Sequence, residues 1–564
     1  MTARGDAEGT AGAGATEDLR FAQAVDRVGG AALFVLLATV LSDPMLVNHD
    51  AAALLFASRM LLDGRLPFVG YFDLNPPLID YVLAVPALVA RAVPLPVPVV
   101  FNLMLVAAVA LSWRLARRTL AGSGLVSETT ASLVALAPLV VSGLARDDAW
   151  GRIDFGQREH LFFLLAVPYL VARWRRWEDR PTAPGLAVGL GLAAGLFASL
   201  KPVFLVTIAA PELLGLVRHR RPRALVAPET LAAAAVVLAY AAHFALLPAA
   251  VREAFFHRWL PLIANGYAAY DAPLREILAR RGLWGALGAA ALPFLLRPSE
   301  QSPAWRLARA FSVATIAAAA GFVLQHKGWS YHLLPAVGGA VVLALLMLAE
   351  STDAGRRLRV APIVPPLSAG ALSLAAGLCV LAGVLLVREG IHPRYSTAYH
   401  VAIAARSDPG DAVLFLDTDV VPQHPTLLEL GRRPGSRYYG NLFTLPMLYR
   451  GARATARGFP YHEGAAMPEE ERRLLNELAE DVRQFAPRIV FVPTGPAMAL
   501  PPGFSILEWL NASGWTARAL AAYAPLAQVG NHLMFVRRTD LPAAVPAARP
   551  SSLQPAVPAA PPKS

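Results

Sequence analysis

Long apolar stretches, separated by short polar breaks, recur from residue 28 to residue 387. Most are about 16 to 24 residues long, which is the length that a helix needs to cross a bilayer. A buried helical core in a soluble protein rarely repeats this pattern so often. The pattern predicts eleven membrane-spanning helices, at 28–47, 98–116, 126–145, 158–173, 184–200, 203–217, 229–248, 283–296, 307–325, 331–348 and 364–387.

Composition supports a membrane protein. Of the 564 residues, 55% are hydrophobic and only 16% are charged, which excludes an ordinary soluble globular protein of this length. The net charge of +11 comes from arginines at the ends of the apolar stretches. Because they form no stripe with interleaved aromatics, we expect no nucleic-acid partner. The single cysteine, Cys379, leaves no intramolecular disulfide and no zinc cluster.

The arginines also predict the orientation of the helices. Arginine-rich breaks alternate with breaks poorer in basic residues, and the positive-inside rule places the basic ones in the cytoplasm. The N-terminal segment, residues 1–27, is then cytoplasmic. Three residues in an external break depart from the rule and are either exceptions or part of an anion site: Arg275, Arg280 and Arg281. The breaks expected in the cytoplasm contain Arg114, Arg117 and Arg118; Arg173, Arg175, Arg176 and Arg180; Arg218, Arg220, Arg221 and Arg223; Arg306 and Arg309; and Arg356, Arg357 and Arg359.

Residues 76–91 are apolar enough to form a further span. A crossing here would move the arginines at 114–118 to the external side, against the positive-inside rule. The segment is short and contains Asp80 and Pro86. We therefore expect it to lie along the outer surface.

The composition changes after Val387. AVLFLDTDVV, RIVFVP and HLMFVRR are strand-like, and PEEERRLLNELAEDVRQF has helical periodicity. Residues 388–540 are therefore expected to form an α/β domain, external by the count of crossings. Residues 541–564 are rich in proline and alanine and are expected to be disordered. The predicted fold is a polytopic α-helical membrane protein, spanning at 28–387, with a C-terminal external α/β domain.

The external breaks concentrate acids, bases and aromatics on one membrane face. Charged groups at a membrane edge are costly, so they are candidates for function. This mixture suits a site in which a carboxylate accepts a proton, cations bind an anionic group and aromatic rings stack on a ligand. The candidate substrate-binding residues are His49, Asp73, Asp147, Asp148, Arg158, Glu159, Lys201, His326, Lys327, Tyr331 and His332. Lys201 and Lys327 are external cations beside apolar spans, and we expect them to hold a phosphate.

The first external break has a distinctive order of residues. Asp50 follows the first span, and after an amphipathic stretch come Asp63-Gly64, Pro67, Tyr71, Asp73 and Pro76-Pro77. This order resembles the GT-C superfamily of membrane glycosyltransferases, and more closely its protein-mannosyltransferase and aminoarabinose-transferase branch.

The resemblance implies that Asp50 is the catalytic base and that the donor is a polyprenyl-phosphate sugar, transferred with inversion. The acceptor would be an envelope lipid, polysaccharide or protein. His49-Asp50-Ala51 stands where the protein-mannosyltransferase form has an Asp-Glu pair, which weighs against a protein acceptor.

Phosphate is a good leaving group once its charge is neutralised, so no cofactor is required, although a divalent cation is compatible with the reaction. The Ala/Arg/Pro-rich composition favours a GC-rich bacterium and hence its inner membrane.

Several residues have simpler explanations. Asp50 could cap a helix that begins at Ala51. Asp147 and Asp148 could be a metal pair, a second acceptor-orienting acid or a solvated loop, and Lys201 could reach the interface by snorkelling. Arg158 and Glu159 could form an ion pair at the interface. Asp417 and Asp419 match the metal-binding Asp-x-Asp pattern of nucleotide-sugar transferases, but the domain offers no phosphate-binding context, so they are interpreted as turn acids at a strand end.

Two other classes of function compete with the enzyme. A transporter or flippase of lipid-linked or anionic solutes needs polar residues at the membrane midplane and usually repeat symmetry. A non-catalytic scaffold for envelope assembly would bind partners through the external domain. Polar residues crowded on one face, followed by a folded external domain, favour the enzyme.

Overall fold

The computed structural model describes residues 3–145, 154–296, 302–358, 369–389, 397–456 and 458–540. The first part of the chain is helical, with α1 (Ala3–Ser42), α2 (His49–Leu62), α3 (Leu78–Ala92), α4 (Val97–Ala121), α5 (Glu128–Ala135), α6 (Ala137–Ala145), α7 (Arg158–Trp177), α8 (Pro184–Ala198), α9 (Pro202–His219), α10 (Pro228–Leu246), α11 (Ala249–Glu253), the π-helical turn η2 (Ala254–Trp259), α12 (Leu260–Gly266), η3 (Tyr267–Tyr270), α13 (Leu274–Leu278), α14 (Arg281–Leu295), α15 (Pro303–Leu324), η4 (Ser330–Leu333), α16 (Leu334–Leu358) and α17 (Ala369–Glu389).

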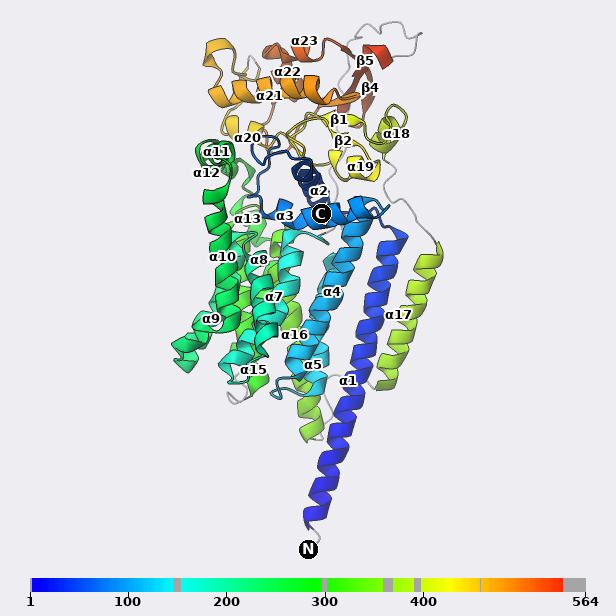
Figure 1. Ribbon diagram of the computed structural model, residues 1–564, viewed down its shortest axis with the longest axis vertical. Helices are drawn as coiled ribbons and strands as arrows, with labels where there is room; N and C mark the ends of the chain where they lie inside the picture. The colour runs from blue at the N-terminus through cyan, green and yellow to red at the C-terminus, as the bar shows by residue number, and fades with distance from the viewer. Residues whose placement is uncertain are drawn as a thin grey trace.

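The long helices run side by side along the long axis of the molecule (Figure 1). Within the described ranges, seven helical segments are long and apolar enough to cross a membrane. They are Thr16–Ser42, Val97–Ala121, Glu128–Ala145, Pro202–His219, Pro228–Leu246, Pro303–Leu324 and Ser330–Ser351. The four remaining predicted spans fall on α7, α8, α14 and α17, which pack against members of this set. The protein is therefore a multi-pass helical bundle, and the count of eleven crossings stays a prediction.

Helix α7 is the least apolar of the helices at the predicted spans, and its charged side chains find partners inside the bundle. Arg173 on α7 is almost fully buried and forms ion pairs with Glu212 of α9, at 2.6 Å, and with Glu229 of α10, at 2.8 Å. Arg176 adds a second contact to Glu229 at 3.0 Å. Buried charges are tolerated when they are paired, so α7 lies inside the bundle with its charge neutralised by its neighbours.

The segment expected along the outer surface forms α3, which lies across the ends of the long helices (Figure 1). Asp80 near its start is buried and accepts a hydrogen bond from the hydroxyl of Tyr71 at 2.7 Å. Exposed apolar side chains, Val85, Leu88 and Val89, lie further along the same helix. This arrangement suits a helix that rests on a membrane surface.

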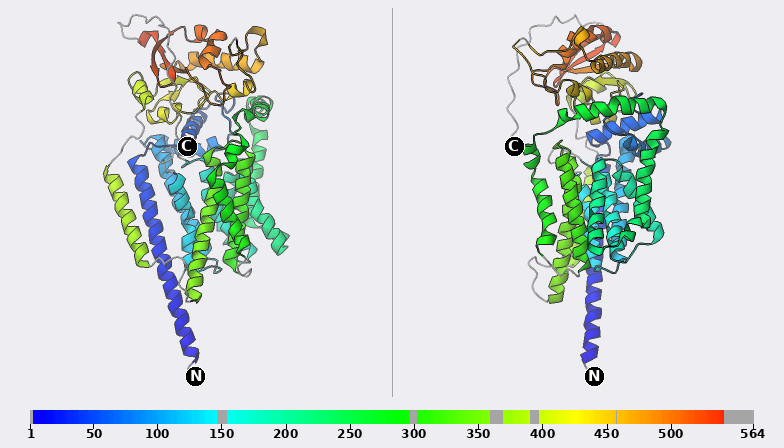
Figure 2. Two further views of the ribbon diagram at one scale, coloured as in Figure 1. Left: turned by 180° about the vertical axis from the view of Figure 1, so that it is seen from behind. Right: turned by 90° about the vertical axis from the view of Figure 1, so that its left-hand side faces the viewer.

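The chain after α17 folds around a five-stranded sheet at the end of the bundle opposite the N-terminus (Figures 1 and 2). The strand order is β2-β1-β3-β5-β4, with β2, β1 and β3 parallel and β5 antiparallel to both β3 and β4. The elements are α18 (Ala398–Ala404), β1 (Ala412–Phe415), α19 (Gln423–Glu429), β2 (Arg433–Pro434), α20 (Thr444–Leu448), α21 (Glu469–Phe485), β3 (Ile489–Pro493), α22 (Ile506–Ala512), α23 (Trp515–Ala519), β4 (Tyr523–Val529) and β5 (His532–Arg537). We call this part the C-terminal unit.

The C-terminal unit rests directly on the bundle. The backbone N–H of Phe72, in the connection between α2 and α3, donates to the carbonyl of Arg437 at 2.9 Å. Phe72 and Phe68 belong to one buried apolar cluster with Trp259 of η2 and with Tyr438 and Phe443 of the C-terminal unit. The two parts therefore share a core, and the space between them has fixed walls.

Candidate active site

A cavity of about 460 Å³ lies between the end of the bundle and the C-terminal unit. Segments that are far apart in the sequence line it: the start of α2, the connection to α3, the start of α7, η3, the turn before α16 and three loops of the C-terminal unit. Its polar and aromatic lining residues are Asn48, His49, Asp50, Phe72, Asp73, Asn75, Asp154, Arg158, Tyr267, Tyr270, Trp329, Ser330, Tyr331, Asp419, Tyr439, Asn441 and Phe443. The cavity thus combines carboxylates, one guanidinium and several aromatic rings.

Asp50 projects into this cavity from the first turn of α2. The helix begins at His49, and its cap is Asn48, whose side-chain oxygen accepts from the backbone N–H of Asp50 at 2.8 Å and of Ala51 at 3.3 Å. The interpretation of Asp50 as a cap for a helix beginning at Ala51 is therefore wrong. The Asp50 carboxylate instead accepts a hydrogen bond from Gln157 Nε2 at 2.9 Å and lies 3.6 Å from His49 Nε2.

The surroundings of Asp50 keep it ionised. Burial raises the pKa of its carboxyl, but His49, the hydrogen bond from Gln157 and the positive charge of Arg158 together outweigh burial. The net result is a pKa below the ordinary value of 3.8. At neutral pH the side chain is therefore a carboxylate that can accept a proton.

Gln157 joins the two elements that carry Asp50 and Arg158. Its Nε2 also donates to Asn48 Oδ1 at 2.7 Å, so one amide holds both the cap of α2 and the carboxylate. Gly156 makes the turn before it, with φ of +87°, and a Cβ at that position would lie 2.7 Å from the ring of Phe101. The run Gln157-Arg158-Glu159-His160 predicts a substrate role for this stretch of the chain. It did not predict the contact of Gln157 with Asp50, because a neutral amide gives no sign of its partner.

Arg158 is the only arginine or lysine among the described residues that line the cavity. It is 7% exposed, and its guanidinium donates to Asn75 Oδ1. Its Nε is buried and has no hydrogen-bond partner within the described ranges. A buried guanidinium with an unused donor, facing a cavity, is suited to binding an anion.

Asp73 differs from Asp50 in the direction of its pKa shift. Burial raises the pKa of Asp73 and exceeds the opposing effects of Tyr439, Arg158 and Asn75. Burial, and then the neighbouring Asp73, raise the pKa of Asp80 well above its ordinary value. The pKa of Asp73 in the cavity lining, and that of Asp80, which is absent from the described lining, are therefore shifted upward, whereas the pKa of Asp50 is shifted downward.

Three other predicted residues form a buried group behind Tyr331. Lys201 Nζ donates to Glu159 and lies 3.0 Å from His332 Nε2. The ammonium is 5.4 Å from the ring centre of Tyr331, which lines the cavity. Lys201, Glu159 and His332 are absent from the described lining, so they stand one layer behind it.

The remaining predictions are placed further away or fall outside the described residues. Lys327 forms an ion pair with Asp271 at 2.6 Å and donates to the carbonyl of Tyr267 at 2.8 Å. Neither it nor His326 is among the described lining residues. Asp147 and Asp148 lie outside the described residues.

The C-terminal unit contributes lining residues that the sequence did not single out, chiefly Tyr439 and Asn441. Asp417 is buried and its carboxylate lies 2.9 Å from His532 Nε2, in line with a structural acid at a strand end. Asp419 accepts from the backbone N–H of Val421 at 3.1 Å, as a turn acid does, and also lines the cavity. The sequence did not predict that Asp419 lines the same cavity as Asp50, because the two residues lie some 370 positions apart in the chain.

Metal ligation has no obvious place in the part of the chain that the structure describes. There, no group of three or more His, Cys, Asp and Glu side chains is arranged to hold a metal ion.

Comparisons with known proteins give structural likenesses only. No family model and no curated protein matches the chain. It is similar to ArnT from Cupriavidus metallidurans in the apo state, at 13% identity over 91% of this chain and 97% of that one, with a TM-score of 0.48. The same protein bound to undecaprenyl phosphate matches at 12% identity over 91% and 97%, with a TM-score of 0.45. The mycobacterial arabinofuranosyltransferase AftD matches at 16% identity over 90% of this chain and 40% of that chain, with a TM-score of 0.42.

ArnT is an aminoarabinose transferase, so these structures include the branch that the first external break resembles. At such identities and TM-scores the likeness says nothing about what the cavity binds. The chemistry rests on the residues that line it.

Replacing Gln157 with leucine should shift the pH dependence of any reaction that uses Asp50 as a base. The hydrogen bond from Gln157 favours the charged form, so its loss raises the pKa of Asp50. Because the pKa of Asp50 is lowered, its carboxylate stays ionised until the pH falls below that pKa. In the wild type, the acid limb of the plot of kcat/KM against pH should therefore lie below pH 3.8. In the variant the limb should move to higher pH in a profile of kcat/KM. An unmoved limb with an unchanged rate would show that Gln157 serves only the cap of α2.

Proposed function

We propose that the chain is a membrane glycosyltransferase that moves a sugar from a polyprenyl-phosphate donor to a hydroxyl of an envelope acceptor on the external face. One observation carries the proposal. A single cavity, at the border of an apolar helical bundle, combines the ionised carboxylate of Asp50 with the guanidinium of Arg158 and the rings of Tyr267, Trp329 and Tyr331. The lipid part of such a donor fits the apolar bundle, and its phosphate and sugar fit the cavity.

The proposed reaction is a single displacement. Asp50 accepts the proton of the acceptor hydroxyl as the hydroxyl oxygen bonds to the anomeric carbon of the sugar. The bond between that carbon and the phosphate oxygen breaks, and the electron pair leaves with the polyprenyl phosphate. Arg158 stabilises the negative charge that remains on the phosphate. Attack from the side opposite the leaving group inverts the anomeric centre.

Arg158 is the proposed principal contact of the donor phosphate. Lys201 and Lys327 remain proposed phosphate ligands, but each is already paired with a carboxylate, Glu159 and Asp271 respectively. Their positive charge is therefore partly neutralised before any donor binds, and we assign them a smaller share of donor affinity. His49, Asp73, Glu159, His326, Tyr331 and His332 remain proposed binding residues.

The transporter alternative fits this geometry less well. An alternating-access transporter places its site near the membrane midplane, reached in turn from both sides. The polar lining residues here lie at one end of the bundle, and Tyr439 and Asn441 of the C-terminal unit close the cavity from the other side. A non-catalytic scaffold does not require an ionised carboxylate and a buried guanidinium, such as those of Asp50 and Arg158, in one cavity.

The reaction itself tests the proposal. Purified protein incubated with a polyprenyl-phosphate sugar should consume the donor when acceptor lipid or polysaccharide is added, with polyprenyl phosphate released in equal amount. Mass spectrometry of envelope glycans and glycolipids from cells with and without the protein should show one sugar missing. Unchanged donor and unchanged glycans would refute the proposal, and movement of intact donor across vesicles would support the transporter.

The C-terminal unit should be labelled only from the external side. Glu480 is well exposed on α21, so a cysteine there, in a Cys379→Ser background, is open to a membrane-impermeant maleimide. Ser351, exposed near the opposite end of the bundle, provides the matched position. In right-side-out vesicles the Glu480→Cys protein should react and the Ser351→Cys protein should not. The reverse pattern would overturn the proposed orientation.

A further inference from the structure

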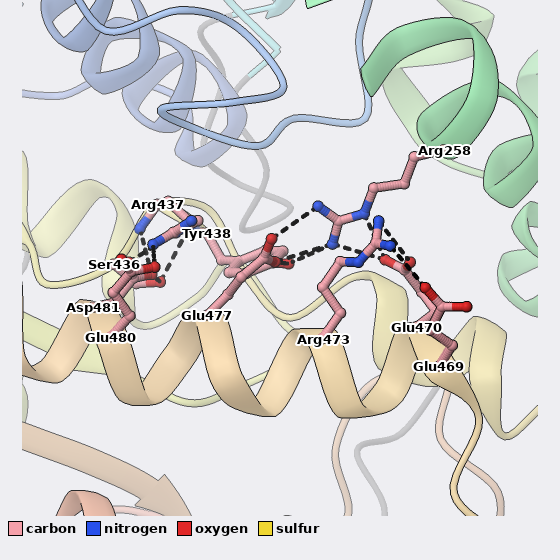
Figure 3. Close-up of polar contacts among 10 residues, drawn as sticks. All are labelled: Arg258, Ser436, Arg437, Tyr438, Glu469, Glu470, Arg473, Glu477, Glu480 and Asp481. Atoms are coloured by element: carbon pink, nitrogen blue, oxygen red, sulfur yellow. Dashed lines mark hydrogen bonds and ion pairs between the residues drawn. The ribbon is translucent and has the colours of Figure 1, made fainter. Parts of the chain in front are cut away.

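One arginine outside the cavity contacts both of its walls. Arg258 lies on η2, beyond the span α10, and reaches toward α21 of the C-terminal unit (Figure 3). Its guanidinium donates to Glu470 at 2.8 Å and, through both terminal nitrogens, to Glu477 at 3.0 Å each. The side chains are 13% exposed for Arg258, 22% for Glu470 and 17% for Glu477, so these contacts are only partly screened by solvent.

The same guanidinium touches the residues next to the lining. It donates to the hydroxyl of Tyr438 at 3.2 Å, and Tyr439, the next residue, lines the cavity. On its other side it lies 4.7 Å from the ring centre of Phe72, which lines the cavity beside Asp73. The neighbouring Trp259 donates from its indole N–H to the backbone carbonyl of Asp73.

The contacted wall segments are themselves held together. The Phe72 N–H donates to the carbonyl of Arg437, and the rings of Phe72 and Tyr438 are 5.5 Å apart. Arg437 and Ser436 are in turn fixed on α21 by Asp481, at 2.8 Å and 2.7 Å (Figure 3). Arg258 therefore contacts two segments that also contact each other, one with Phe72 and the other with Tyr438.

We propose that Arg258 is a positioning residue that sets the spacing of the two cavity walls, one from the connection between α2 and α3 and the other from the C-terminal unit. The inference rests on the proposed function in so far as the cavity is where transfer occurs. Arg258 touches no lining side chain with a catalytic assignment, so its effect reaches the reaction through Phe72 and Tyr438.

Two measurements on the full-length protein in detergent or nanodiscs test this. Arg258→Met removes the guanidinium, and Arg258→Lys restores one charge without the fork that joins Glu470 to Glu477. Arg473→Met is the matched control, because Arg473 also contacts Glu470 and Glu469 on α21 (Figure 3). Its ion pairs and hydrogen bonds within the described ranges include neither Phe72 nor Tyr438. Tyr438→Phe is a milder variant, since it loses a single hydroxyl.

Residue-resolved hydrogen exchange should show faster exchange of the Phe72 amide in Arg258→Met and unchanged exchange in Arg473→Met. Transfer, measured as kcat/KM per folded molecule, should fall on the order of 10²-fold in Arg258→Met, as expected for displaced reacting groups. Arg258→Lys and Tyr438→Phe should lie between this variant and the wild type.

Two results would overturn the inference. Lower thermal stability with an unchanged Phe72 amide and unchanged kcat/KM would make Arg258 a structural residue only. Faster exchange at Phe72 with normal transfer would show that the wall spacing does not matter for the reaction. If the wild-type chain transfers no sugar, the proposed function fails, while the exchange comparison still decides whether Arg258 joins the two walls.

Discussion

Replacement of Asp50 with asparagine should lower sugar transfer by about 10²-fold or more while the protein still folds and binds donor. Asparagine has nearly the same size and can still accept the hydrogen bond that Gln157 donates. It cannot take a proton from a hydroxyl at neutral pH. The start of α2 should survive the change, because the cap is Asn48 and not Asp50.

Asp63→Asn is the matched control for this experiment. Asp63 lies at the other end of α2, forms an exposed ion pair with Arg91 and does not line the cavity. Such surface pairs contribute about 0 to 1 kcal/mol to stability, so this variant should transfer sugar normally. Turnover should be compared at saturating donor and acceptor, after circular dichroism and gel filtration have shown equal folding. A folded Asp50→Asn protein with a near-normal rate would end the catalytic assignment.

The fold could be anticipated where the sequence signal is local. Runs of apolar residues long enough to cross a bilayer mark each predicted span, and within the described ranges helices occupy most of those positions. β1, β3 and β5 also lie where their apolar runs predicted them. The apolar pattern did not predict β2 because that strand is only two residues long, or β4 because Pro525 and a bulge break its alternation.

The site was anticipated in part, for a related physical reason. Asp50, Asp73 and Arg158 stand out because charges at the ends of apolar segments are costly. Whether a charge is free or neutralised depends on partners from other elements, which the sequence does not place. Lys201 illustrates this: its partners Glu159 and His332 lie 42 and 131 residues away. Neutral groups such as Gln157 and Asn441 carry no such signal, so only the folded chain brings Gln157 to Asp50 and Asn441 to the cavity.

Loss of the Arg158 guanidinium should also give a large effect, this time on donor binding. Arg158 is the only arginine or lysine among the described lining residues, and its Nε is an unused buried donor within the described ranges. A hydrogen bond to a charged group contributes about 1.5 to 3 kcal/mol, which corresponds to about 10- to 150-fold in Kd. Arg158→Met should weaken binding of a polyprenyl phosphate by this factor, measured by microscale thermophoresis or by competition with labelled donor.

Two further variants, Lys327→Met and Arg158→Lys, distinguish a direct contact with the phosphate from a general effect of positive charge. Lys327→Met removes a cation that is already paired with Asp271 and lies behind the lining, so it should weaken donor binding far less. Arg158→Lys keeps the charge but loses the forked donor set, and should recover only part of the affinity. Arg158 also lowers the pKa of Asp50, so Arg158→Met should move the acid limb of kcat/KM to higher pH as well. Equal losses of donor affinity in Arg158→Met and Lys327→Met would place the phosphate between these residues, because an anion held mainly by Arg158 cannot depend equally on a neutralised lysine.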